Sequence, residues 1–293
     1  VGESGSGKTT TALAVMRLSP VTSGHIQLGD TDLGALEGEA LRQARTRLQI
    51  IFQDPFSSLN PRERAGAAVR APLDLMQVGT PAQRTERVAE LFKAVGLRPE
   101  QQHLFPHQFS GGQRQRINIA RALATNPELV VCDEPVSALD IAIRAQILNL
   151  LARLQRELGL TYLFISHDMA VVEHICDDIA VMYLGQIVER GPRKAFFANP
   201  LHPYSVALMS AVPTVHGGRK HAAQRIKLSG DPPSPINPPP GCRFAGRCPM
   251  AEPACVAELP PLREVVPDHR VRCRRVDVVD GLPKAPLQMP TAY

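Results

Sequence analysis

Gly2-Glu3-Ser4-Gly5-Ser6-Gly7-Lys8-Thr9, at the start of a chain of 293 residues, decides the fold. The stretch satisfies the pattern G-x-x-x-x-G-K-[ST], whose glycines let the backbone turn tightly so that successive N–H groups point at phosphate oxygens. Lys8 suits the β and γ phosphates of a nucleotide, and the hydroxyl of Thr9 suits Mg²⁺. The stretch therefore predicts a nucleotide site, although it does not say what the nucleotide is used for. The predicted nucleotide contacts are Gly2, Glu3, Ser4, Gly5, Ser6, Gly7, Lys8, Thr9 and Thr10.

Short β-branched runs alternate with longer stretches of helical periodicity over residues 1–215. The predicted strands are residues 50–52, 129–132, 162–165 and 179–184. The predicted helices are residues 8–18, 80–95, 112–124, 141–157 and 169–175, with a hairpin arm at 24–29 and a helical insertion within 53–111. The strands 129–132 and 162–165 lack a polar face, as in a parallel sheet covered on both sides, so the pattern predicts an α/β fold.

A phosphate-binding loop of this kind is normally fed by a β-strand. This chain begins one residue before the motif. We therefore expect an N-terminally truncated sequence, a fragment whose first strands are missing.

The net charge of +5 lies wholly in the last part of the chain. Lys and Arg balance Asp and Glu at 21 each over residues 1–215, but they number 12 against 7 over residues 216–293. Of the 27 prolines, 17 fall from Pro200 onward, as do four of the six cysteines, which predicts a boundary near residue 215. Because the basic excess is modest and scattered among prolines, we expect no nucleic-acid partner.

The overall composition, with 44% hydrophobic and 21% charged residues, excludes a disordered chain, a collagen-like repeat and a disulfide miniprotein. No run approaches the roughly 18 apolar residues that cross a bilayer, and the first residues do not form a signal peptide. The composition thus predicts a cytosolic location.

Asp133 and Glu134 end the apolar run 129–132. Side chains that follow the end of a strand can both reach one site because the chain turns there. Asp133 suits Mg²⁺, and Glu134 suits a general base that polarises an attacking water. The alternative is a strand that simply runs into an acidic turn, and the upstream phosphate-binding motif makes it the weaker interpretation.

Ser110-Gly111-Gly112-Gln113 opens a second predicted helix with a serine and two glycines, as at a phosphate-binding N-terminus. These motifs closely resemble those of ABC-transporter ATPases, whose signature is SGGQ. Further motifs of that family occur in order at Gln53, at Ser137-Ala-Leu-Asp140 and at His167, and the resemblance covers residues 1–215. It implies an α/β P-loop NTPase (RecA-like) cassette with a helical subdomain and a small loop-rich C-terminal cap.

The resemblance also implies roles that residue types alone do not supply. In the family two cassettes pack head to tail, so Ser110 and Gly112 would serve the partner's ATP. Gly111, Gln113 and Asp140 are further predicted nucleotide contacts. Gln53 would join Thr9 and Asp133 around Mg²⁺ and would relay the state of the γ-phosphate to a membrane subunit. Glu134 and His167 would complete the catalytic set, although a single histidine near a strand end is more often structural.

Several sequence segments resemble those of the peptide-importer branch of the family. They are residues 53–61, 134–140 and 199–204 followed by 208–213. The stretch 132–137 resembles the second, F-type, of the two unlike ATPases in such importers, which favours a heterodimer over a homodimer. The implied partners are integral membrane permeases and, indirectly, an extracytoplasmic solute-binding protein, with the chain peripheral on the cytoplasmic face of the membrane. Nickel or glutathione import is the alternative within this branch. A soluble ABC ATPase that acts on ribosomes or DNA is a distant one, because the chain has a single signature and no coiled coil.

Four cysteines of the basic tail, Cys242, Cys248, Cys255 and Cys273, lack the two close pairs of a usual zinc site. Four thiolates can also hold a 4Fe-4S cluster, and similar tails in peptide-importer ATPases carry four such cysteines. Unrelated buried thiols are the remaining alternative. Neighbouring arginines are expected to offset the thiolate charge, namely Arg243, Arg247, Arg272, Arg274 and Arg275.

The expected domain organisation has four parts. Residues 1–53 and 127–215 form the P-loop core, residues 54–126 form the helical signature subdomain, and residues 216–293 form the cysteine-bearing C-terminal domain.

Overall fold

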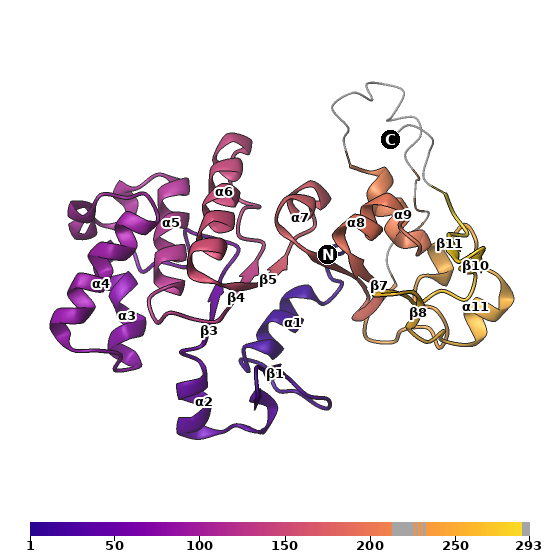
Figure 1. Cartoon of the computed structure of the whole chain (residues 1–293), viewed down its shortest axis with the longest axis horizontal. Coiled ribbons are helices and arrows are strands. Elements are labelled where there is room, and N and C mark those ends of the chain that lie inside the picture. Colours follow the sequence, from indigo (N-terminus) through magenta and orange to yellow (C-terminus); the bar gives the residue numbers. More distant parts are fainter. Residues whose placement is uncertain (213–225, 227, 229, 231–232, 289–293) are drawn as a thin grey trace. The chain divides into compact units, whose positions relative to one another are not determined.

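The computed structural model describes residues 1–212, 226, 228, 230 and 233–288, and the predicted boundary near residue 215 lies outside them. The chain divides into two compact units (Figure 1). Unit 1 comprises Val1–Lys8 and Ser166–Tyr293, and unit 2 comprises Thr9–Ile165. Each unit is described by itself.

Unit 2 is built on a parallel sheet in the order β3 (Leu48–Ile51), β4 (Leu129–Asp133), β5 (Thr161–Ile165). In register, Leu48 lies opposite Leu129, which lies opposite Thr161. Four of the five residues of β4 are buried, as expected for a central strand covered on both faces. The core on one side contains Ala12, Met16, Leu33, Ala44, Leu48, Val131 and Ile165. The predicted parallel α/β arrangement is confirmed, with strand ends shifted by one or two residues.

The other elements of unit 2 are α1 (Lys8–Val15), which begins in unit 1, the short hairpin β1 (Gln27–Leu28) and β2 (Thr31–Asp32), and α2 (Gly38–Ala44). The helical insertion predicted within residues 53–111 is confirmed as α3 (Ala65–Leu75) and α4 (Pro81–Ala94), and the helix predicted at residues 112–124 is α5 (Gly111–Ala122). Helix α4 begins at a capping box between Thr80 and Gln83, with Pro81 at its first position. Helix α6 (Ile141–Leu158) links β4 to β5.

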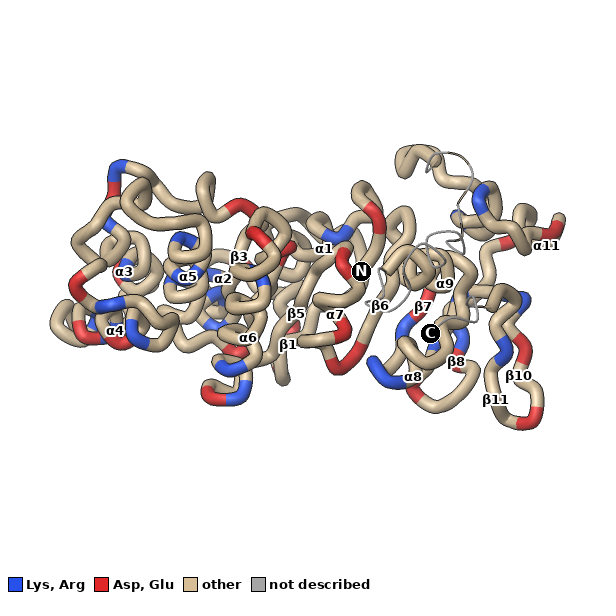
Figure 2. The backbone as a smooth tube through the Cα atoms, turned by 90° about the horizontal axis from the view of Figure 1, so that it is seen from above, with Lys and Arg blue, Asp and Glu red and all other residues tan. Residues whose placement is uncertain are grey.

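Helices α3, α4 and α6 carry charged residues of both signs, whereas the charged residues of α5 are all arginines (Figure 2). Several form ion pairs one turn apart, such as Arg70 with Asp74 at 3.0 Å and Arg153 with Glu157 at 2.6 Å. Such exposed pairs contribute little individually, about 0.3–0.5 kcal/mol. They mark the solvent faces of the helices.

Unit 1 contains an antiparallel sheet in the order β6 (Asp178–Tyr183), β7 (Gln186–Pro192), β9 (His269–Val271), β8 (Arg263–Val266). The sheet therefore joins strands from residues 178–192 to strands of the basic tail. Other elements in the described part of unit 1 are α7 (Met169–Ile175), α8 (Arg193–Ala198), α9 (Pro203–Ser210), α11 (Pro253–Ala257) and the hairpin β10 (Asp277–Val279) and β11 (Leu282–Lys284). Among the described residues of both units, no helix is long and apolar enough to span a bilayer.

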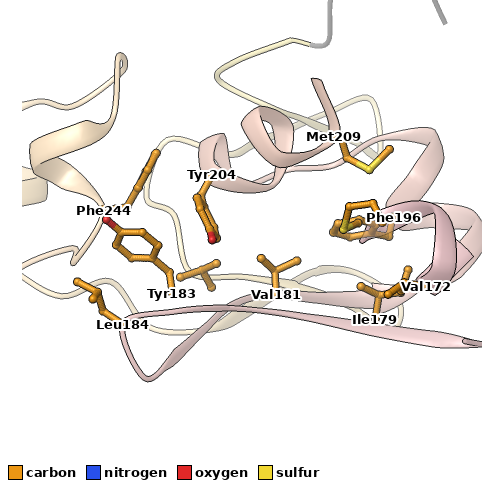
Figure 3. Packing of buried hydrophobic residues seen from close by; sticks show 11 residues of the cluster. Val172, Ile179, Val181, Tyr183, Leu184, Phe196, Tyr204, Met209 and Phe244 are labelled. Atoms are coloured by element: carbon orange, nitrogen blue, oxygen red, sulfur yellow. The ribbon is translucent and has the colours of Figure 1, made fainter. Parts of the chain in front are cut away.

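The core of unit 1 packs α7, α8 and α9 against β6 (Figure 3). At one end the rings of Tyr183, Tyr204 and Phe244 meet with centroids 4.7–5.4 Å apart. Such tilted aromatic contacts add about 0.5–1.5 kcal/mol each beyond area burial. Phe244 comes from the tail, so this core also includes residues that the sequence assigns to a separate C-terminal domain.

Glu189 of β7 is fully buried, and several groups satisfy its carboxylate. It accepts hydrogen bonds from the backbone N–H groups of Leu201 and His202, both at 2.8 Å, and contacts Nε2 of His269 at 2.8 Å. Gly191 makes room for this histidine, because a Cβ there would lie 2.9 Å from the His269 ring. A buried carboxylate without such partners would cost several kcal/mol.

Candidate functional site

The glycine-rich loop forms a compact turn at the start of unit 1. The N–H of Met182 donates to the carbonyl of Val1 at 2.7 Å, so the chain enters the loop alongside β6. Gly2 is required there, since a Cβ would lie 2.2 Å from the carbonyl oxygen of Met182. Gly5 and Gly7 have positive φ values of 77° and 99°, which suit glycine.

Lys8 folds back over this loop. Its ammonium group donates to the carbonyls of Gly2 at 2.8 Å and Glu3 at 2.9 Å, and the residue is only 9% exposed. Beyond it, Thr9 and Thr10 are exposed in the first turn of α1. The loop can therefore offer backbone N–H groups and a positive charge to a phosphate chain.

The acidic pair lies at the carboxyl end of β4 in unit 2, where ligands commonly bind in open α/β sheets. Asp133 is 5% exposed, and Glu134 takes a left-handed conformation with φ of 48°. The N–H of Glu134 donates to Ile165 at 3.0 Å, and its carbonyl accepts from the hydroxyl of Ser137 at 3.0 Å. This uncommon backbone conformation is held by neighbours on two sides, as is typical of functional turns.

The structure brings Gln53 and Glu134 together. Gln53 follows β3, and its Nε2 donates to Oε2 of Glu134 at 3.1 Å. The two residues are 81 positions apart in sequence, and the parallel pairing of β3 with β4 aligns the ends of their strands. A carboxylate beside a side-chain amide at the edge of a sheet suits a group that orients and activates a water molecule.

The signature residues form the N-terminus of α5 in unit 2. Ser110 is the N-cap, and it forms a capping box with Gln113 at distances of 2.9 and 3.3 Å. Gly112 is required by packing, because a Cβ would lie 2.6 Å from Cγ2 of Ile143 on α6. A Cβ on Gly111 would make only ordinary van der Waals contacts, with its nearest neighbours at 3.8 Å. The sequence pattern S-x-x-Q at residues 110–113 is typical of a capping box, a signal that sequence reasoning did not use.

Two further predicted site residues lie at helix starts. Asp140 occupies the N-cap position of α6 and is exposed. His167 is exposed between β5 and α7, in unit 1, next to Asp168, which caps α7 through a 3.0 Å bond from the N–H of Ala170. Their predicted contacts with nucleotide remain predictions.

The four tail cysteines line one cavity in unit 1, together with Phe244, Met250 and Arg275. Burial raises the pKa of Cys242, and it raises the pKa of Cys248 and Cys273 to about 11. Gly241 lets two segments approach, since its Cβ would lie 2.4 Å from the carbonyl of Cys255. Among the described residues, no three His, Cys, Asp or Glu side chains are arranged to hold a single metal ion.

Most of the tail arginines bind carbonyl groups or carboxylates of the protein. Arg272 donates to Ile187 and Pro260, and Arg275 donates to Met250. Arg243 donates to the carbonyl of Leu184, and Arg247 donates to the carboxylate of Glu3. The charges of Arg272 and Arg275 act to lower the thiol pKa of Cys242 and Cys248, against the larger effect of burial. For Arg243 and Arg247, the expected role in offsetting thiolate charge stays a prediction.

Sequence reasoning also missed Tyr204. Its hydroxyl oxygen accepts the N–H of Glu3 at 2.8 Å, which connects α9 to the phosphate-binding loop. No sequence pattern signals a contact across 201 positions.

Comparisons with known proteins give matches over both parts of the chain. The family profile described as "ABC transporter" matches residues 1–137, and that described as "Oligopeptide/dipeptide transporter, C-terminal region" matches residues 188–255. An oligopeptide transport ATP-binding protein, AppF of Bacillus subtilis, is 48% identical over 93% of this chain and 83% of that protein. A putative peptide import ATP-binding protein of Brucella ovis is 50% identical over 95% of this chain and 87% of that protein.

A solved structure matches as well. The ATP-binding cassette MJ0796, in a dimeric post-hydrolysis state bound to ADP and Pi, aligns with a TM-score of 0.58 at 31% identity. The match covers 66% of this chain and 83% of that chain.

Proposed function

The chain belongs to the ABC transporter ATPases that carry the oligopeptide/dipeptide C-terminal region, and from this premise we propose that it hydrolyses ATP to energise peptide import. The observation that carries the catalytic part is the contact between Gln53 and Glu134 at the end of β4. The relatives named for peptide import support the transport part, and they favour peptides over nickel or glutathione.

Different residues would bind the phosphates, hold Mg²⁺ and activate the attacking water. The N–H groups of the loop and the ammonium of Lys8 would bind phosphate oxygens. Thr9, Asp133 and Gln53 have the oxygen ligands that Mg²⁺ prefers, and Mg²⁺ would neutralise phosphate charge when bound. Glu134 would take the proton of the attacking water while Gln53 holds its carboxylate in place, and His167 would contact the γ-phosphate.

A second cassette would complete each site. The exposed N-terminus of α5 at Ser110 would bind the ATP of the partner, together with Gly111, Gly112, Gln113 and Asp140. The dimeric state of the structural neighbour supports a pair of cassettes. For this chain we favour a pair with a second, unlike ATPase.

A membrane permease would dock beside Gln53. A groove of about 520 Å³ in unit 2 is lined by Gln49, Ile50, Phe52, Ser57, Ser58, Pro72, Arg121 and Ala122. Phe52 and Phe56, on either side of Gln53 in sequence, are exposed aromatic residues of the kind enriched at interfaces. Docking there would place the chain peripherally on the cytoplasmic face of the membrane, with a solute-binding protein engaged indirectly. Since the basic excess is modest and scattered among the prolines of the tail, we propose no nucleic-acid partner.

The cysteine cavity is a candidate site for a 4Fe-4S cluster rather than zinc. The donor set fits in number and kind, because four thiols line one cavity. The spacing of these cysteines lacks the two close pairs of a usual zinc site. Iron and acid-labile sulfide in anaerobically purified protein would support the cluster, whereas zinc without sulfide would reject it.

The central test is Glu134→Gln. Removing the general base lowers turnover by about 10²–10⁴-fold, while binding of MgATP stays within a factor of about two because Lys8 and the loop are untouched. Steady-state hydrolysis and equilibrium MgATP binding give the two readouts.

Glu128→Gln is the matched control, since Glu128 precedes the same strand but forms an exposed pair with Arg47. Substantial hydrolysis by the Glu134 variant would remove this residue as the base. In reconstituted vesicles, ATP-driven uptake of nickel or glutathione but not of peptides would reject peptide import.

A further inference from the structure

The C-terminal region holds the phosphate-binding loop through Glu3, a residue whose side chain the general motif leaves unspecified. Glu3, Tyr204 and Arg247 all lie in unit 1, so these contacts are made within one compact body. The three polar groups of Glu3 are its N–H, its carbonyl and its carboxylate. Each of them has a partner.

The carboxylate of Glu3 accepts a two-pronged contact from Arg247. One guanidinium nitrogen lies 2.8 Å from Oε2, and the other lies 3.4 Å from Oε1. The side chain of Arg247 is 10% exposed and that of Glu3 is 33% exposed, so solvent screens the pair only in part. The bond to Glu3 raises the pKa of Arg247. Such fork-shaped contacts fix geometry as well as adding energy.

Aromatic residues support the two side chains that contact Glu3. Tyr204 is fully buried, and its ring packs on Tyr183 and Phe244 (Figure 3). Its hydroxyl oxygen accepts the N–H of Glu3. Arg247 also approaches the hydroxyl of Tyr183 at 3.4 Å. Buried aromatic residues therefore contact both side chains that bind Glu3.

Glu3 in turn contacts Lys8 through its backbone carbonyl. The carbonyl of Glu3 accepts the Lys8 ammonium at 2.9 Å and the N–H of Ser6 at 3.2 Å. A second contact acts on the same loop, because Gly185 donates to Ser6 at 2.7 Å and the neighbouring Leu184 carbonyl is bound by Arg243.

We propose that Arg247 and Tyr204 are positioning residues for ATP binding, which set the phosphate-binding loop and Lys8 through Glu3. The proposal rests on the proposed ATPase function. It gives the C-terminal region a part in nucleotide binding, and it predicts that damage to this region lowers affinity for MgATP before it lowers the chemical rate.

The test compares variants of the full chain, each purified together with the subunits that co-purify with it. Arg247→Met should raise the KM for MgATP about tenfold with kcat within a factor of about two, since it removes one partly buried charge-assisted contact. Tyr204→Phe, which keeps the ring, should raise KM about threefold because it removes one neutral acceptor. Arg247→Lys should raise the KM for MgATP less than Arg247→Met does, because lysine keeps the positive charge.

Arg270→Met is the matched control. Arg270 lies in the same region and pairs with Glu264, but both side chains are about half exposed, at 50% and 45%. Its KM should equal that of the wild type. The double variant Glu3→Gln with Arg247→Met should lose less MgATP binding free energy than the sum of the two single variants. The reason is that both substitutions remove the same contact between Glu3 and Arg247.

Amide hydrogen exchange of residues 1–8 gives a readout that does not depend on hydrolysis. Exchange there should be faster in Arg247→Met and Tyr204→Phe than in Arg270→Met. Unchanged exchange and unchanged KM, with only a lower melting temperature, would overturn the proposal. If the wild type fails to hydrolyse MgATP, the proposed function is what fails, and the exchange result still decides whether the tail positions the loop.

Discussion

At the scale of single residues, His202 shows how burial turns a motif residue into a structural one. The residue is 1% exposed, and its Nδ1 accepts the N–H of Tyr204 at 3.1 Å as the N-cap of α9. Burial lowers its pKa from 6.5 to about 3. The neutral ring is thus part of the fold, and proline at the next position starts the helix.

This pKa predicts acid sensitivity with a definite sign. In the unfolded chain His202 binds a proton below about pH 6.5, whereas in the folded chain it stays neutral down to about pH 3. The free energy of unfolding therefore falls as the pH drops through this window, by up to about 1.4 kcal/mol per pH unit. Above pH 7 the residue contributes no pH dependence.

His202→Asn isolates this effect, since asparagine is a good N-cap that does not titrate. We expect denaturant unfolding between pH 7 and pH 4 to show a shallower loss of stability in this variant. His103→Asn, at an exposed position, is the control and should keep the wild-type slope. Equal slopes in all three proteins would show that His202 is not the group that titrates.

At the scale of elements, the two signature glycines of α5 have different reasons to be glycine. A Cβ on Gly112 would meet Ile143 at 2.6 Å, but one on Gly111 would meet nothing closer than 3.8 Å. Gly111→Ala should therefore keep or raise stability, by up to about 1 kcal/mol through helix propensity. Gly112→Ala should lower it by about 1–3 kcal/mol through overpacking.

Thermal unfolding of the two variants checks this difference. Adding Ile143→Ala to Gly112→Ala should restore part of the lost stability, because it removes the contacting methyl groups. If Gly112→Ala is as stable as Gly111→Ala, packing against α6 is not the reason for that glycine, and contact with the partner's nucleotide remains as the explanation.

The elements also show what sequence can and cannot give. Strands β4 and β5 are predictable because they are continuous apolar runs between turn residues. Strand β7 is not, because it carries Glu189, Arg190 and Gly191, and Glu189 becomes a core residue only through partners up to 80 positions away. Glu134 is predictable from its residue type at the end of an apolar run, and Gln53 from the resemblance to ABC-transporter ATPases. The contacts of Tyr204 and Arg247 with Glu3 are not predictable, because they depend on tertiary packing.

At the scale of the whole molecule, strands from both sides of the composition boundary near residue 215 belong to one sheet. Strand β9 pairs with β7, and His269 caps the buried Glu189. A chain ending at residue 212 should therefore expose the edge of β7 and leave a buried carboxylate with fewer partners, which costs about 3–5 kcal/mol.

Solubility and urea unfolding test this prediction. We expect the chain ending at residue 212 to aggregate or to unfold at much lower urea, because an open strand edge invites association. Removing only residues 277–293 should have a smaller effect, since β10 and β11 pair with each other and expose Val278, Val279 and Leu282. A stable, monomeric chain of 212 residues would contradict the shared sheet.

The contact between Glu3 and Arg247 also has an evolutionary consequence. The two residues are 244 positions apart, yet a charge change at one leaves the other without its counterpart. Among descendants of a common ancestor, the two positions should therefore change together, as Glu with Arg or as a pair of uncharged residues. Such correlated replacement would mark the C-terminal region as inherited jointly with the nucleotide site, rather than as an appendage free to be exchanged.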